Sequence, residues 1–213
     1  MKRGKPLKRT KGAREEQRRF LIYCEGECTE EQYFKGLRAD LRALPVTIQL
    51  GGRYGEPRSL VREAIAHKER APHSSADRWT SYDEVWCVID VEAPVPHPTL
   101  PEALRLAERN GIGVVRSDPC FELWLLLHFQ DSFGYLTSDQ AQRALEKLGA
   151  CGYSSNRKHL DFEALRTGHA DARGRAQALR ERATKVAEGR AVNPWTDVDR
   201  LVEVLKASRG RRP

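Results

Sequence analysis

Two groups of acidic residues in this sequence stand at the ends of apolar runs. Glu25 follows the run 19–24 and is itself followed by Glu27 and Glu30. Asp90 and Glu92 stand at the end of a second run, 84–91. Ligands of open α/β sheets gather at the carboxyl ends of the strands. Because residues two apart in an extended chain point the same way, we expect Asp90 and Glu92 to present oxygens to one cation.

Carboxylates in this arrangement suit a magnesium ion. Mg²⁺ prefers hard oxygen ligands, takes few of them from protein, and completes its octahedron with water and substrate phosphate. The spacing alone leaves a second interpretation open, in which the acids are solvated loop carboxylates or helix caps. For Glu27 and Glu30, at the start of a predicted helix, capping is the alternative to ligation.

The elements that must position these acids alternate along the chain. Short apolar runs bounded by turns predict buried parallel strands, and amphipathic spacing predicts helices between them. We expect strands at 19–24, 46–50, 84–91 and 112–116. We expect helices from Thr29 to before Pro45 and at 58–70, 100–109 and 119–129. This alternation predicts an α/β fold, a parallel sheet with helices on both faces.

The C-terminal third has a helical pattern. We expect helices at 139–148, 161–166, 170–187 and 195–207. The predicted organisation is a disordered basic tail at 1–18, an α/β domain at 19–150, and a helical extension at 151–208 packed on it.

Charge is concentrated at the two ends of the chain. The first 19 residues hold nine Lys or Arg against two Glu, and the last five residues hold three Arg. Because the whole chain has a net charge of +7, residues 20–208 have a net charge of −3. Basic tails attract phosphates without regard to sequence, and a solvated tail that aids solubility is the alternative. The candidate nucleic-acid contacts of the N-terminal tail are Lys2, Arg3, Lys5, Lys8, Arg9 and Lys11.

Composition excludes several classes of protein. No apolar run approaches the roughly 18–20 residues of a membrane span, and no apolar segment follows the N-terminal charges as in a secretory signal. Five cysteines are an odd number, and most lie in apolar runs. This pattern indicates reduced thiols and a cytoplasmic protein.

Four stretches of the chain resemble the RloB family. They are 25–34 (EGECTEEQYF), 86–92 (WCVIDVE), 117–129 (SDPCFELWLLLHF) and 193–202 (NPWTDVDRLV). RloB-like proteins look like Toprim proteins encoded beside an ATPase partner in bacterial restriction and phage-defence loci. The resemblance implies a Toprim-like fold with a glutamate after the first strand, matched by Glu25, and a DxD motif after a later strand. Asp90 matches the first aspartate of that motif, but its second position is Glu92, which keeps the charge and has a side chain one methylene longer.

Three further residues are candidates for the same site. Glu122 is the only charge within 120–127, and an ionised carboxylate buried alone is costly. It is therefore either a further acidic ligand, or a residue that points outward from a helix buried on its other faces or caps a backbone N–H. Lys158 and, second, Arg116 are candidates to neutralise transition-state charge, and solvated surface is the alternative for both.

The resulting hypothesis is a nuclease that hydrolyses phosphodiester bonds of DNA or RNA with Mg²⁺ or Mn²⁺. Glu25, Asp90 and Lys158 would be catalytic, and Glu25, Asp90, Glu92 and Glu122 would hold the metal. By resemblance it would act in phage defence with an ATPase partner. Two rivals stay open: a non-catalytic subunit that binds nucleic acid or a partner through a degenerate site, and a phosphohydrolase or nucleotidyl transferase for smaller substrates.

Overall fold

One mostly parallel sheet organises the fold. The computed structural model describes residues 18–26, 28–41, 46–50, 56–132, 134–154, 159–186 and 192–209. Within these ranges five strands pair in the order β2-β1-β3-β4-β5. Their bounds are β1 Phe20–Cys24, β2 Val46–Leu50, β3 Glu84–Asp90, β4 Gly113–Asp118 and β5 Trp195–Thr196. The first four strands run parallel, and β5 is antiparallel to β4.

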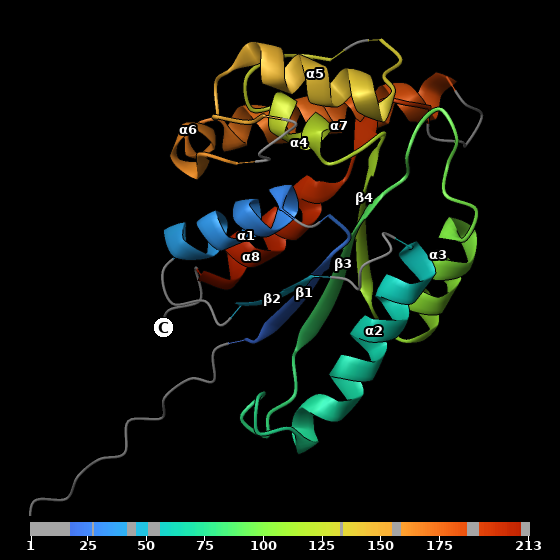
Figure 1. The fold of residues 1–213 in the computed structure, drawn as a ribbon, viewed down its shortest axis with the longest axis vertical. Coiled ribbons are helices and arrows are strands. Elements are labelled where there is room, and N and C mark those ends of the chain that lie inside the picture. The colour runs from blue at the N-terminus through green and yellow to red at the C-terminus, as the bar shows by residue number, and fades with distance from the viewer. Residues whose placement is uncertain are drawn as a thin grey trace, which may run out of the picture.

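Helices cover both faces of the sheet, as predicted (Figure 1). On one face lie α2 (Pro57–Arg70) and α3 (Leu100–Arg109), and on the other α1 (Thr29–Asp40) and α8 (Val198–Arg209). A further group gathers beyond the end at which β4 finishes: α4 (Glu122–Leu126), α5 (Ser138–Leu148), α6 (Phe162–Arg166) and α7 (His169–Val186). A short 3-10 helix, η1 (Ala71–His73), follows α2. The mixed α/β class and the helical C-terminal part are confirmed.

The strands are buried on both faces because their side chains alternate between two cores. In β1, Phe20 and Ile22 join a core with α1, α4, α7 and α8. Leu21 and Tyr23 join a second core with α2 and α3. This burial explains why the run 19–24 is continuously apolar rather than alternating.

The long helix predicted at 119–129 is wrong. The structure has only the five-residue α4, followed by turns in which His128 and Phe129 donate to carbonyls three residues back. The Pro119 carbonyl accepts from the Glu92 N–H at 2.8 Å, and the Leu123 N–H donates to Cys120 instead. The first helical turn therefore cannot form at Pro119.

The predicted helix at 195–207 begins too early. Trp195 and Thr196 pair with Asp118 and Ser117 as β5, and α8 begins at Val198. This C-terminal segment thus adds a strand to the sheet, and Val198 and Leu201 of α8 lie in the same core as β1. The proposed domain division near residue 150 stays a prediction.

Two sequence inferences about the environment can be compared with the structure. All five cysteines are free thiols. None of the helices in the described ranges combines the length and apolar character that crossing a bilayer requires. Cytoplasmic localisation itself stays a prediction.

Candidate functional site

Glu25 links the carboxyl ends of β1 and β3. Strand pairing places Cys24 opposite Val88, and the Glu25 N–H continues the ladder by donating to the Val88 carbonyl at 3.3 Å. The Glu25 carboxylate then accepts from the Asp90 N–H at 3.0 Å. The two acids that sequence reasoning singled out, 65 residues apart, therefore lie side by side.

The environment of Glu25 favours its protonated form. Burial raises the pKa of this carboxyl from 4.5 to about 8, although the hydrogen bond from the Asp90 N–H acts in the opposite direction. The negative charges of Glu92, Glu30 and Glu56 raise the pKa further. A group with a pKa near neutrality can both give and take a proton.

Asp90 lies deeper in the same acidic environment. Burial raises the pKa of its carboxyl well above the ordinary value, and the charges of Glu30, Glu122 and Glu25 add to the shift. A hydrogen bond from the Phe121 backbone opposes it. Among the described residues, the Asp90 Oδ1 atom has no hydrogen-bond partner and no contact with solvent. An acceptor oxygen buried without a donor or cation is unusual in a folded protein.

Glu122 faces inward and has a specific partner. It is the first residue of α4, and 4% of it is exposed. The buried Tyr153 hydroxyl donates to its Oε1 atom at 3.0 Å. The interpretation that Glu122 points outward from a buried helix is therefore wrong. Sequence reasoning missed Tyr153, because the residue lies 31 positions away in a loop whose local pattern carries no signal for this contact.

Glu30 is buried at the start of α1, with 4% exposed. A Cβ atom added to Gly26 would overlap the oxygens of its carboxylate. The carboxylate therefore lies directly over Gly26, and the absence of a side chain there leaves room for it. The position in the first helical turn also favours its negative charge, so the structure is compatible with both roles that the sequence left open.

Glu92 does not adopt the extended geometry that the sequence argument assumed. β3 ends at Asp90, and Glu92 is exposed with a φ of 67°. Its N–H is held by the Pro119 carbonyl at 2.8 Å. The expectation that Asp90 and Glu92 point the same way along one extended chain is wrong. Glu92 still lies close enough for its charge to raise the pKa of Glu25, and its role as a ligand stays a prediction.

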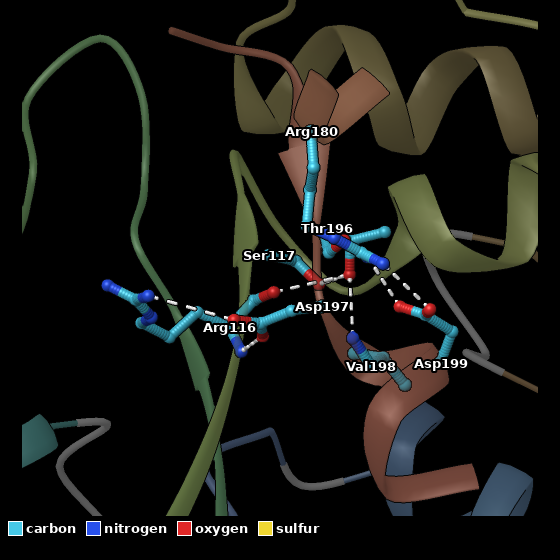
Figure 2. A network of polar contacts seen from close by, with 7 residues as sticks. All are labelled: Arg116, Ser117, Arg180, Thr196, Asp197, Val198 and Asp199. Atoms are coloured by element: carbon cyan, nitrogen blue, oxygen red, sulfur yellow. Dashed lines mark hydrogen bonds and ion pairs between the residues drawn. The ribbon is translucent and has the colours of Figure 1, made fainter. Parts of the chain in front are cut away.

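Arg116 belongs to a network that fixes the C-terminal segment to the sheet (Figure 2). Its guanidinium lies 3.6 Å from the Asp197 carboxylate and 4.8 Å from the centre of the Trp195 ring. The Arg116 N–H also donates to Asp197. These contacts favour a structural role for Arg116.

The same network includes an ion pair between a partly buried arginine and a buried aspartate. The Arg180 guanidinium donates through both terminal nitrogens to the Asp199 carboxylate, with the longer bond at 2.8 Å, and also to the Thr196 carbonyl. The Ser117 and Thr196 hydroxyls lie 2.9 Å apart and are hydrogen-bonded. The stretch 193–202 that carries the family resemblance therefore ties β4, β5, α7 and α8 together.

Several candidate residues lie outside the described residues. They are Glu27, Lys158 and the tail residues Lys2, Arg3, Lys5, Lys8, Arg9 and Lys11. Their proposed roles stay predictions.

The acidic residues fit a magnesium ion by chemistry, although they do not form a complete cage. Across the described ranges, no three His, Cys, Asp or Glu side chains are arranged so that they could hold a metal ion. Mg²⁺ usually takes only one or two carboxylates and fills its remaining positions with water and phosphate. The donorless Asp90 Oδ1 beside Glu25 offers such hard oxygen ligands, and the charge of a cation there would offset both the burial and the repulsion that raise the pKa of the two carboxyls.

Fold and site together define a class of protein, an α/β protein with an acidic cluster at the carboxyl ends of a parallel sheet. The chain belongs to the RloB-like family, because the family model described as RloB-like protein matches residues 20–205, most of its length. No curated protein and no solved structure matches the chain.

Proposed function

We propose that this protein is a Mg²⁺-dependent nuclease that hydrolyses phosphodiester bonds of DNA or RNA. The observation that carries the proposal is the contact of Glu25 with Asp90 at the ends of β1 and β3, in surroundings that raise the pKa of both carboxyls. A bound divalent cation would stabilise the ionised form of clustered carboxylates of this kind, because it is the largest charge in the site.

Each candidate residue would have its own role in the reaction. Asp90 would hold the ion together with one further carboxylate, Glu122 or Glu92, and Tyr153 would keep the Glu122 carboxylate oriented. A bound Mg²⁺ or Mn²⁺ supplies Lewis-acid polarisation of the phosphate and a more acidic water. Glu25 would move a proton at its carboxylate, or ligate, since its pKa of about 8 lies near the working pH. Lys158 would neutralise charge on the phosphate.

The biological setting is a proposal that follows from the family. RloB-like membership supports a Toprim-like fold and a role in phage defence beside an ATPase partner. The basic N-terminal tail would add sequence-independent attraction to nucleic acid.

The test is a cleavage assay with purified protein on plasmid, single-stranded DNA and RNA, with Mg²⁺, Mn²⁺ or EDTA, and with and without the ATPase. Glu25→Gln and Asp90→Asn should reduce metal-dependent cleavage to background while the circular dichroism spectrum stays unchanged. Glu108→Gln is the matched control, because Glu108 is an exposed carboxylate on α3. Cleavage that survives Asp90→Asn would refute the proposal.

The geometry of Glu92 favours a second candidate, a non-catalytic subunit that binds nucleic acid or its partner. Glu92 is exposed and outside the strand, where the family resemblance implies the second aspartate of a DxD pair. A wild-type protein without metal-dependent cleavage in every condition above, but with tail-dependent binding to nucleic acid, would favour this candidate.

A further inference from the structure

A turn at the opposite end of the sheet displays a tryptophan to solvent. Residues 74–81 lie between η1 and β3, at the amino-terminal ends of the strands, whereas the acidic cluster lies at their carboxyl ends (Figure 1). Trp79 is 66% exposed, whereas Trp124 is fully buried. This exposure is not explained by packing or by the proposed site.

The inner side of the turn is held rigidly. The Arg19 guanidinium, directly before β1, donates to the carbonyls of Asp77, Thr80 and Ser81. The buried Asp77 carboxylate accepts from the Tyr82 hydroxyl at 2.6 Å and lies 3.0 Å from His67 Nε2. The turn is therefore a fixed platform.

The outer side of the turn has an uncommon backbone. Arg78 and Trp79 are consecutive and both left-handed, with φ of 58° and 57°. Their N–H groups donate to Ser75 and Ser74 at 3.0 and 2.9 Å. Bulky residues seldom adopt positive φ, and such strain tends to occur where the surrounding structure fixes a functional geometry.

The side chains around Trp79 do not form an apolar patch. Trp79 is the only large apolar residue in 74–81, and the exposed residues beside it are Ser75, Ala76, Arg78, Thr80 and Ser81. Protein interfaces are built around a contiguous buried apolar core, which this surface lacks. A single ring beside a cation is instead sufficient to stack on a nucleic-acid base and contact its phosphate.

The charge at this end of the molecule has the sign that such a ligand requires. Arg78 in the turn is exposed, and Arg18 and Arg19 directly precede β1 at this end of the sheet. Arg70 and His73, just before the turn, are exposed. Of the carboxylates close in sequence, Asp83 accepts from the Arg19 N–H at 2.6 Å and Glu84 is paired with Arg18, whereas Glu69 is exposed.

We infer that the 74–81 turn is a binding surface for single-stranded nucleic acid, with Trp79 stacking on a base and Arg78 contacting a phosphate. The surface lies away from the acidic cluster and does not require that cluster to hold metal or to cleave. Binding measured in EDTA therefore separates a failure of this inference from a failure of the proposed nuclease activity.

The experiment measures fluorescence anisotropy of labelled 20-nucleotide oligo(dT) and oligo(U) with the full chain in EDTA. Stacking on one base corresponds to about a 5- to 150-fold change in affinity, so we expect Trp79→Ala to weaken binding about tenfold and Trp79→Phe to restore most of the loss. Arg78→Ala should lower the slope of log affinity against log salt by about 0.7, the value for one phosphate contact on a single strand.

Matched controls on other surfaces are Tyr135→Ala, an aromatic side chain that is 58% exposed, and Arg143→Ala, an arginine side chain that is 76% exposed. Both should bind as the wild type does. Trp79→Gly should also weaken binding and fold well, because glycine suits the positive φ. Wild-type affinity in Trp79→Ala, or an equal loss in Tyr135→Ala, would overturn the inference. Loss of ATPase binding with unchanged oligonucleotide affinity would also overturn it and identify a protein interface.

Discussion

Replacing Glu25 by glutamine should stabilise the metal-free protein, although the same change should abolish the proposed activity. The Glu25 carboxyl has a pKa raised from 4.5 to about 8, chiefly by burial. At pH 7.5 the unfolded chain would ionise this group freely, whereas the folded chain holds it mostly protonated. From the ordinary pKa of 4.5 to pH 7.5 there are about three pH units, and at about 1.36 kcal/mol for each unit the folded state carries a free-energy penalty of about 4 kcal/mol.

Glutamine removes the charge and keeps an oxygen that can accept from the Asp90 N–H. After the desolvation of its own amide, we expect a net gain of about 2 kcal/mol. For a chain of this size that corresponds to a rise in melting temperature of about 4–8 °C. The assay is thermal unfolding in EDTA at a series of pH values, with Glu108→Gln as the control for an exposed carboxylate.

The sign of the pH dependence is specific to a carboxyl whose folded-state pKa is raised. The penalty is absent below about pH 4.5, grows as pH rises, and levels off above about pH 8. The stability difference between Glu25→Gln and wild type should follow this curve. A difference that is independent of pH, or a glutamine variant less stable than wild type at pH 8.5, would refute the description of Glu25 as a buried, repelled carboxyl.

Three further predictions concern the surrounding structure. Tyr153→Phe leaves the buried Glu122 without its hydroxyl partner, so urea unfolding should show a free energy of unfolding lower by about 1–3 kcal/mol. Calorimetry should show weaker Mg²⁺ binding by the same variant. Unchanged Mg²⁺ affinity would contradict the positioning role of Tyr153. His169 is buried with a pKa lowered to about 4, so only the unfolded state gains its proton as the pH falls below about 6.5. Between pH 7 and pH 5 the free energy of unfolding of the wild type should therefore fall by about 2 kcal/mol relative to that of His169→Gln. A stability difference that stays constant over this pH range would contradict the prediction. Asp199→Asn breaks the ion pair with Arg180 and should lower the free energy of unfolding by about 2–4 kcal/mol, measured as a lower melting temperature. An unchanged melting temperature would show that the pair does not stabilise the fold.

The sequence predicts the central sheet well because β1 and β3 are buried on both faces. Such strands need continuous apolar residues, so 19–24 and 84–91 are visible without any tertiary information. The positions of Glu25 and Asp90 follow from these strands, because parallel neighbours end at the same edge of the sheet. The positions of Glu25 and Asp90 could therefore be predicted from the strand ends and the order of the elements alone.

The remaining details depend on contacts between distant segments. The helix expected from Pro119 is shortened because the Glu92 N–H takes the Pro119 carbonyl, a bond between residues 27 positions apart. Trp195 becomes part of a strand because β4 offers a free edge beside it, against a helical local pattern. Tyr153 reaches Glu122 from a loop. None of these contacts leaves a periodic signal in the sequence.

The central claim is that Asp90 and its acidic neighbours hold a divalent ion, and Mn²⁺ binding tests it most directly. Free Mn²⁺ can be measured by electron paramagnetic resonance as the ion is titrated into wild type, Asp90→Asn and Glu108→Gln at pH 8. We predict one ion per chain in wild type and Glu108→Gln, and binding at least about tenfold weaker in Asp90→Asn. Equal binding by all three proteins, or none by the wild type, would contradict the account.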